Sequence, residues 1–280
     1  MLKWADLIRE NYEEIALLET LEVGKPIGDT SGYDALAVAR VIQWYGETID
    51  KTYDEIAPAP KSALAMITRE PLGVIGAIVP WNYPIVIASW KIGPALAMGN
   101  SMVLKPSEES SLAILRIAEL GIEAGLPKGV FNVVTGLGAE AGQALARHKD
   151  VAKIAFTGSG PVGKLMMQYA AESNMKQVAL ELGGKSPQVV LDDVVDIDKA
   201  ASTIAWGIFY NAGQISPELD AKGAKAYTTY QQSARSAVSD LITYDALVAA
   251  KANPSKDNIN AVLADFEKVV NDLLSLYLAA

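Results

Sequence analysis

The stretch GVIGAIVPWNYPIVIASWKIGPALAMGNSMVLKP, residues 73–106, decides the fold. It opens with a short apolar run at 73–80 that is typical of a buried strand. A longer apolar segment at 86–99 ends on glycine, as helices often do. A second strand-like run follows at 101–106. Strand, helix and strand in this order predict a βαβ unit, whose two strands are parallel in one sheet.

The same alternation continues towards the carboxyl terminus. Further strand-like runs lie at 130–136, 151–158 and 176–184, and helix-like runs lie at 111–125, 140–148, 163–174 and 196–211. Residues 71–215 are therefore expected to form an α/β domain, a parallel sheet with helices on both faces. Sheets of this kind bind ligands at the carboxyl ends of their strands.

The two flanks of this domain have a different character. Before it, residues 1–70 contain apolar positions at helical spacing over 3–22 and 33–56, followed by an extended segment. After it, residues 216–280 show no strand alternation and read as an α-helical tail of two or three amphipathic helices. The sequence thus predicts three parts, which end at residues 70, 215 and 280.

Composition excludes several classes of function. The chain has 24 basic and 33 acidic residues and a net charge of −9, which argues against nucleic acid and against an anionic membrane surface as partners. No apolar run is long enough to span a bilayer, and the first residues lack a signal-peptide pattern, so a cytoplasmic protein is expected. With no cysteine and one histidine, His148, neither thiol catalysis nor a metal site is expected.

Two short patterns are suited to a dinucleotide. Gly158, Gly160 and Gly163 have GxGxxG spacing between a strand and a helix, where backbone amides could reach a pyrophosphate. The alternative is a tight strand-to-helix turn without a ligand. Lys105 and Glu108 follow a strand and could grip the hydroxyls of a ribose, or they could belong to a solvated loop in which Glu108 favours a helix N-terminus.

Two further residues are suited to catalysis. Asn82 lies between two prolines that stiffen its loop, so its side-chain amide could stabilise an oxyanion, or it could simply be a hydrogen-bonded loop residue. Glu181 ends an apolar strand just before two glycines. Apolar neighbours could raise the pKa of its carboxyl towards that of a useful general base, although a plain loop-edge glutamate is the alternative.

The order of the motifs is more specific than any single motif. PWNYP, GNSMVLKPSE, GLPKGVFNVVTGLG, IAFTGS, LELGGKSP and NAGQ resemble, in this order, the signatures of the NAD(P)-dependent aldehyde dehydrogenase superfamily. The resemblance covers residues 1–215 and is strongest to the γ-glutamyl-γ-aminobutyraldehyde, aminoaldehyde and betaine aldehyde types. It implies the family's partial Rossmann-like domain for 71–215, with NAD as the cofactor.

The resemblance also implies roles for particular residues. Asn82 would supply the oxyanion amide, and Glu181 would be the base. Lys105 and Glu108 would hold the adenosine ribose, and a glutamate at this position favours NAD over NADP. The full set of implied cofactor contacts is Ile78, Pro80, Trp81, Lys105, Ser107, Glu108, Gly138, Gly142, Phe156, Thr157, Gly158, Ser159, Val162, Leu182 and Gly183.

The chain departs from the family pattern at Ser216, which stands where the family has its catalytic cysteine. A serine hydroxyl is a much weaker nucleophile without a strong adjacent base. After Ser216 nothing resembles the family. We therefore expect a truncated or chimeric NAD-binding fragment with little or no oxidation of an aminoaldehyde, which would bind the aldehyde only if the site were complete. The alternative is a scaffold for a helical tail that interacts with partners or associates with itself.

Overall fold

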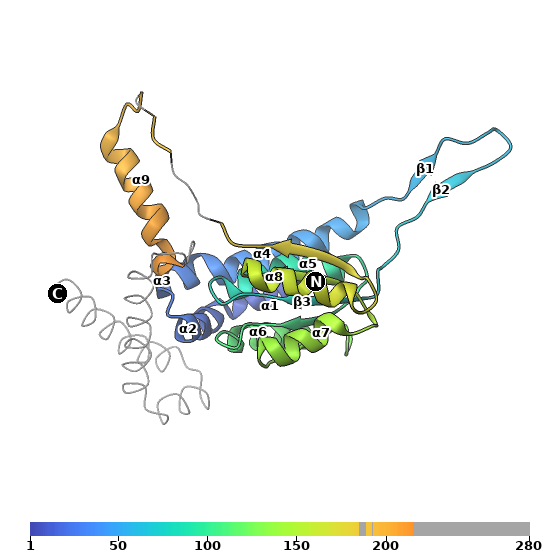
Figure 1. Cartoon of the computed structure of the whole chain (residues 1–280), viewed down its shortest axis with the longest axis horizontal. Coiled ribbons are helices and arrows are strands. Elements are labelled where there is room, and N and C mark those ends of the chain that lie inside the picture. Colours follow the sequence, from blue (N-terminus) through green and yellow to red (C-terminus); the bar gives the residue numbers. More distant parts are fainter. Residues whose placement is uncertain (185–188, 192, 215–280) are drawn as a thin grey trace. The chain divides into compact units, whose positions relative to one another are not determined.

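The computed structural model describes residues 1–184, 189–191 and 193–214 (Figure 1). Ser216 and the helical tail expected at 216–280 lie outside the described residues. In the part that is described, no helix is both long and apolar enough to cross a membrane.

The centre of the fold is a five-stranded parallel sheet in the order β5-β4-β3-β6-β7. This confirms the α/β fold and the parallel sheet predicted from the sequence. Each strand is followed by a loop that contains polar or glycine residues. The bounds of the strands are β3 Val74–Ile78, β4 Ser101–Lys105, β5 Phe131–Val133, β6 Val151–Thr157 and β7 Gln177–Glu181.

The sheet is covered on both faces, as predicted. Ile75 of β3 is paired with Met102 of β4, and both belong to a core that includes residues of α5 (Pro84–Ala97) and α6 (Leu112–Glu123). On the opposite face, Ile78 and Phe156 pack with residues of α7 (Gln143–Arg147) and α8 (Gly160–Ala171). A π-helical turn at Gly138–Gly142 leads into α7.

The amino-terminal helices extend the first of these cores. They are α1 (Leu2–Glu10), α2 (Tyr12–Val23), α3 (Ile27–Asp29), a π-helical turn (Thr30–Asp34) and α4 (Ala35–Thr48). Trp4 is buried, and its indole N–H donates to the carbonyl of Ile117 at 2.9 Å. The sequence predicted one continuous helix over 3–22, and this prediction is wrong, because α1 ends at Glu10 and α2 begins at Tyr12. The helix breaks at Asn11, whose side chain donates to the Leu7 carbonyl at 2.8 Å.

A two-stranded antiparallel hairpin also replaces part of an expected helix. The helix predicted over 33–56 ends at Thr48 and continues only as a 3₁₀ turn at Ile49–Lys51. Glu55–Ala57 instead forms β1, which pairs with β2 (Ala65–Ile67). The prolines that follow β1 in the sequence disfavour helix here, and pairing with a distant strand decides the outcome. Figure 1 shows this hairpin as the light-blue arm.

The last described helix, α9, spans Ile197–Phe209 and is followed by a 3₁₀ turn at Tyr210–Gly213. Its N-terminus is capped by Asp196, whose carboxylate accepts from the Lys199 N–H at 2.9 Å. This cap satisfies one of the unpaired amides of the first turn. The helix predicted at 196–211 is thereby confirmed, and it leads directly into the conspicuous NAGQ segment.

Candidate active site

The strand order places a topological switch point at the carboxyl edge of the sheet. The chain moves outward from β3 to β4 and β5, then returns to place β6 on the other side of β3. Loops that leave β3 and β6 therefore diverge, and such a switch point is where open α/β sheets bind their ligands. Four residues singled out from the sequence, Ile78, Lys105, Thr157 and Glu181, are the last residues of β3, β4, β6 and β7.

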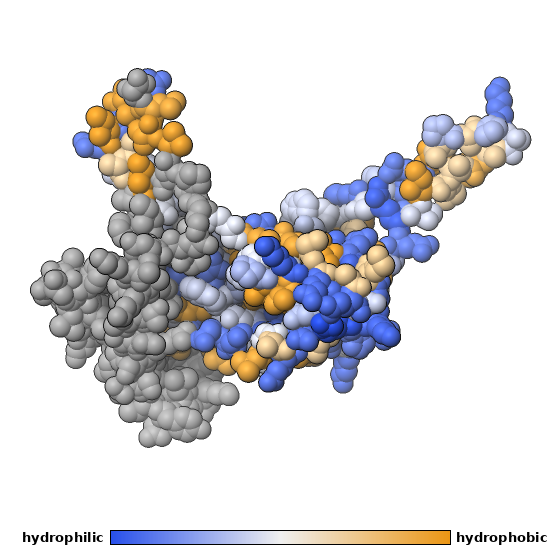
Figure 2. Space-filling model, viewed as in Figure 1, coloured by the Kyte–Doolittle hydropathy of each residue, from blue (hydrophilic) through white to orange (hydrophobic). Residues whose placement is uncertain are grey.

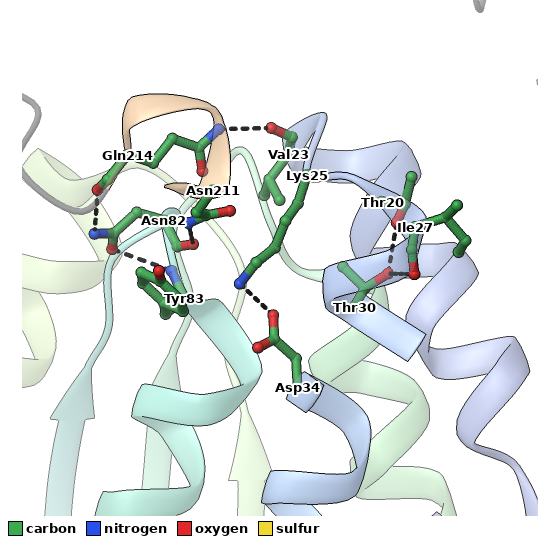
Figure 3. A network of polar contacts seen from close by, with 10 residues as sticks. All are labelled: Thr20, Val23, Lys25, Ile27, Thr30, Asp34, Asn82, Tyr83, Asn211 and Gln214. Atoms are coloured by element: carbon green, nitrogen blue, oxygen red, sulfur yellow. Dashed lines mark hydrogen bonds and ion pairs between the residues drawn. The ribbon is translucent and has the colours of Figure 1, made fainter. Parts of the chain in front are cut away.

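Asn82 lies in the loop between β3 and α5, and both ends of its side-chain amide are held (Figure 3). Its Oδ1 accepts from the backbone N–H of Tyr83 at 3.1 Å, and its Nδ2 donates to the carbonyl of Gln214 at 2.9 Å. Asn211 in turn donates to the Asn82 carbonyl at 3.0 Å. The structure thus brings Asn82 to the NAGQ segment, which ends two residues before Ser216 in the sequence.

Lys105 and Glu108 form a second polar centre at the end of β4. The Lys105 side chain is only 3% exposed, and its ammonium donates to the Pro106 carbonyl and lies 3.4 Å from the Glu108 carboxylate. A Cβ at Gly142 would stand 3.5 Å from Lys105 Cδ, so the turn that contains Gly138 covers this lysine. A lysine ammonium has three N–H groups. Among the described residues two acceptors face it, which leaves capacity for a ligand hydroxyl.

The glycines at the end of β6 are explained in part by packing. A Cβ at Gly158 would lie 2.6 Å from the Phe156 ring, and one at Gly163 would lie 2.6 Å from Leu182 Cδ2. Position 158 therefore requires glycine whether or not a dinucleotide binds, because the Phe156 ring is buried, whereas a Cβ at 163 would have to displace the exposed Leu182 side chain and one at Gly160 would meet nothing within 4 Å. The close packing supports the tight-turn interpretation of the GxGxxG spacing.

The remaining predicted residues line the same edge of the sheet. Ser159 precedes α8 as its N-cap, with no side-chain hydrogen bond to the helix, and Val162 in the first turn is exposed. Pro80, Trp81 and Ser107 are half-buried, and Gly183 is exposed.

Glu181 ends β7 with its side chain exposed. The apolar enclosure expected from the sequence is missing among the described residues, because β7 is an edge strand that buries only one face. Its N-terminal neighbour Leu180 packs inward, and the Glu181 carbonyl accepts from the Gly158 N–H at 3.0 Å.

Sequence reasoning missed a lysine near this edge. Lys91 of α5 donates to the Thr157 hydroxyl at 2.8 Å. Burial lowers the pKa of the Lys91 ammonium, and the charge of Glu181 opposes that shift. The sequence contains one charged residue, Lys91, inside the apolar segment at 84–97. A charge in such a segment needs a polar partner, so this residue could have been predicted to lie near a polar site.

A buried ionic cluster was also missed. Lys25 and Asp34 form an ion pair in which both side chains are 0% exposed, and the Lys25 ammonium lies 3.8 Å from the centroid of the Tyr83 ring. Glu19 is buried beside them. Burial raises the pKa of the Glu19 carboxyl well above its ordinary value and also raises that of Asp34. Among the described residues, no group of three or more acidic or histidine side chains is arranged to hold a metal ion.

Comparison with known proteins gives consistent matches over the described fold. The model of the "Aldehyde dehydrogenase family" matches residues 1–219. The chain is 57% identical over 213 residues to the NADP/NAD-dependent aldehyde dehydrogenase PuuC of Escherichia coli, covering 76% of this chain and 43% of that protein. It is 50% identical over 214 residues to an aminoacetaldehyde dehydrogenase of Pseudomonas aeruginosa, with the same two coverages.

Solved structures give the same result. The γ-glutamyl-γ-aminobutyraldehyde dehydrogenase of Burkholderia cenocepacia is 58% identical with a TM-score of 0.74, and an indole-3-acetaldehyde dehydrogenase in complex with NAD⁺ is 54% identical with a TM-score of 0.74. Each match covers 76% of this chain and 43% of the solved one. The chain therefore spans less than half the length of the relatives it matches.

Proposed function

This chain belongs to the aldehyde dehydrogenase family, and on that basis we propose that its α/β domain, residues 71–215, binds NAD at the carboxyl edge of the sheet. One observation carries the proposal: the expected cofactor residues, far apart in the sequence, gather at the strand ends around the switch point between β3 and β6. Bound NAD would supply a hydride acceptor. The chain's own groups would hold and orient it.

Lys105 and Glu108 are the proposed ribose contacts. The buried ammonium of Lys105 would donate to a ribose hydroxyl, and the half-exposed Glu108 carboxylate would accept from one. A 2′-phosphate in the same place would meet the negative charge of Glu108 and be repelled. NAD is therefore the proposed cofactor, and NADP is disfavoured. The solved NAD⁺ complex of a relative supports this assignment.

Asn82 and Glu181 are the proposed catalytic groups. The amide of Asn82 is held by Tyr83 and Gln214, as an oxyanion donor must be held before the reaction begins. Glu181 is an exposed carboxylate, placed to act as the base toward a water molecule. The chain contains no cysteine, and Ser216 stands where the family has its nucleophile. We therefore propose that it binds NAD but oxidises aminoaldehydes slowly or not at all.

A second candidate function concerns residues 216–280. Their sequence places apolar residues at helical spacing, from Ile259 to Tyr277, which favours helices that bind a partner or a second copy. In that case the α/β domain would serve as a scaffold. Removing residues 217–280 and measuring the mass in solution tests this candidate, because self-association through the tail predicts a smaller assembly after removal.

Titration with NAD, followed by tryptophan fluorescence, tests the first proposal. We expect saturable quenching in the parent chain. Val162→Asp, which adds a negative charge beside the proposed cofactor path, should weaken NAD binding. Met167→Asp is the matched control, because it places the same charge on another exposed apolar position of α8. A parent chain that shows no saturation, or equal weakening by both variants, would contradict the proposal.

A further inference from the structure

Three segments that are distant in the sequence converge on Asn82 (Figure 3). The first runs from Val23, the last residue of α2, to Lys25. The second contains Asn82 and Tyr83, and the third ends at Gln214. Gln214 donates from its side chain to the Val23 carbonyl at 3.2 Å and accepts through its backbone from Asn82. Lys25 completes these contacts, since its ammonium lies against the Tyr83 ring. We call the set formed by Val23, Lys25, Asn82, Tyr83 and Gln214 the positioning circuit.

The turn after α2 directs Lys25 into this circuit. Gly24 adopts the left-handed conformation, with φ of +71°, and terminates the helix. A residue with a Cβ is strained at such a φ, so glycine permits the sharp change of direction. The Lys25 side chain then points inward, where it reaches Asp34. Thr20 and Thr30 share a hydrogen bond at 2.8 Å and tie α2 to the segment that carries Asp34.

Burying this charge is costly, because a buried ion loses its hydration before its partners compensate. Lys25 is compensated on two sides, by the Asp34 carboxylate and by the face of the Tyr83 ring. A desolvated cation attracts the face of an aromatic ring more strongly than a solvated one does. The attraction therefore acts on Tyr83, the residue whose backbone N–H holds Asn82 Oδ1.

We propose that Lys25, anchored by Asp34, is a positioning residue that fixes the side-chain amide of Asn82 through the ring of Tyr83. The inference rests on the proposed role of Asn82 as the oxyanion donor. Asn82 Nδ2 carries two N–H groups, and the one that donates to Gln214 sets the direction of the other. If Tyr83 shifts, the plane of the amide turns and that second N–H no longer has a fixed direction.

The test follows the side-chain amide of Asn82 by NMR, with the signal assigned from its loss in Asn82→Asp. In the parent chain we expect two separate N–H signals, one of them protected from hydrogen exchange. Tyr83→Leu removes the ring but keeps the backbone N–H and should reduce this protection by about 30-fold, the effect of losing one desolvated cation–π contact. Tyr83→Phe keeps the ring but removes the hydroxyl that contacts Asn211, so it should reduce the protection less than Tyr83→Leu does.

Lys25→Met should also move the Asn82 signals. Lys176→Met is the matched control: Lys176 is another buried lysine, and it donates to the Ala146 carbonyl at 2.7 Å, outside the circuit. A merely structural role for Lys25 predicts lower stability with the Asn82 signals unmoved, which would overturn the inference. If Lys25→Met does not fold, Tyr83→Leu still tests the inference, because it keeps the ion pair between Lys25 and Asp34. Unchanged protection of the Asn82 amide in Tyr83→Leu would also overturn the inference.

The outcome is separable from that of the proposed function. The Asn82 signals are read without cofactor, so a chain that fails to bind NAD still reports on the positioning circuit. Conversely, NAD can bind at Lys105 and Glu108 while the Asn82 amide turns freely. Titrating the same variants with NAD therefore assigns any failure to one proposal or to the other.

Discussion

Replacing Glu19 by glutamine should make the stability of the protein less dependent on pH. Glu19 is fully buried, and its carboxyl has a pKa raised first by loss of hydration and then by the charge of Asp34. Lys25 lowers this pKa, and Glu22 adds a smaller upward shift. The protonated carboxyl can donate to Asp34, and a glutamine amide can do the same without titrating.

The sign follows from proton binding. Because the pKa of Glu19 is higher in the folded chain, the folded state keeps a proton that the unfolded state releases. The stability that Glu19 contributes is complete below its unfolded pKa, about 4.3, and is lost as pH rises through its folded pKa. Within that window, each pH unit costs about 1.4 kcal/mol of unfolding free energy. Glu19→Gln removes this slope.

Urea unfolding at a series of pH values measures the effect. We expect the difference in unfolding free energy between Glu19→Gln and the parent chain to grow in favour of the variant as pH rises from 5, at about 1.4 kcal/mol per unit until the folded carboxyl ionises. Glu10→Gln is the control, because Glu10 is exposed on α1. Parallel curves for Glu19→Gln and the parent chain would refute the reasoning.

Three further changes test other parts of the structure. Ile154→Ala deletes a fully buried side chain of β6 and should cost about 2–5 kcal/mol by urea unfolding, so a loss below about 1 kcal/mol would contradict the packing described. Glu108→Gln removes the charge proposed to repel a 2′-phosphate. It should therefore lower the dissociation constant for NADP relative to that for NAD, whereas an unchanged ratio of the two constants would reject that role. Gly163→Ala should displace Leu182, which is exposed and can yield, and so weaken NAD binding at little cost in stability. Unaltered NAD titration would show that Leu182 does not contact the cofactor.

Much of the sheet could be predicted because its strands and helices carry local signals. Residues 73–106 contain two apolar β-rich runs and a long apolar segment between them, and the structure contains β3, α5 and β4 there. The residues at strand ends could be located for the same reason, since parallel strands end at one edge.

The hairpin and the helix break could not be predicted in this way. Ile56 has apolar helical neighbours in sequence, but it pairs with Met66, and that choice depends on a strand ten residues away. Asn11 interrupts a periodic apolar pattern through a hydrogen bond to Leu7 that composition does not reveal. Local pattern does not determine either outcome.

The buried ionic cluster shows a second limit. A lysine and an aspartate nine residues apart, Lys25 and Asp34, are ordinarily expected at the surface. Their burial depends on Tyr83 and on α2 packing around them, and these contacts come from other parts of the chain. Glu181 shows the opposite error, because it was expected among apolar neighbours and is exposed. It lies on an edge strand, and the local sequence does not specify the order of the strands in the sheet.

A single-turnover experiment tests most directly the claim that this chain binds NAD without carrying out thiol-dependent oxidation. Protein in excess is mixed with NAD and an aminoaldehyde, and cofactor binding and NADH absorbance are followed in the same sample. We predict that the NAD becomes bound and that no NADH forms. NADH formed in proportion to the bound NAD would contradict the account.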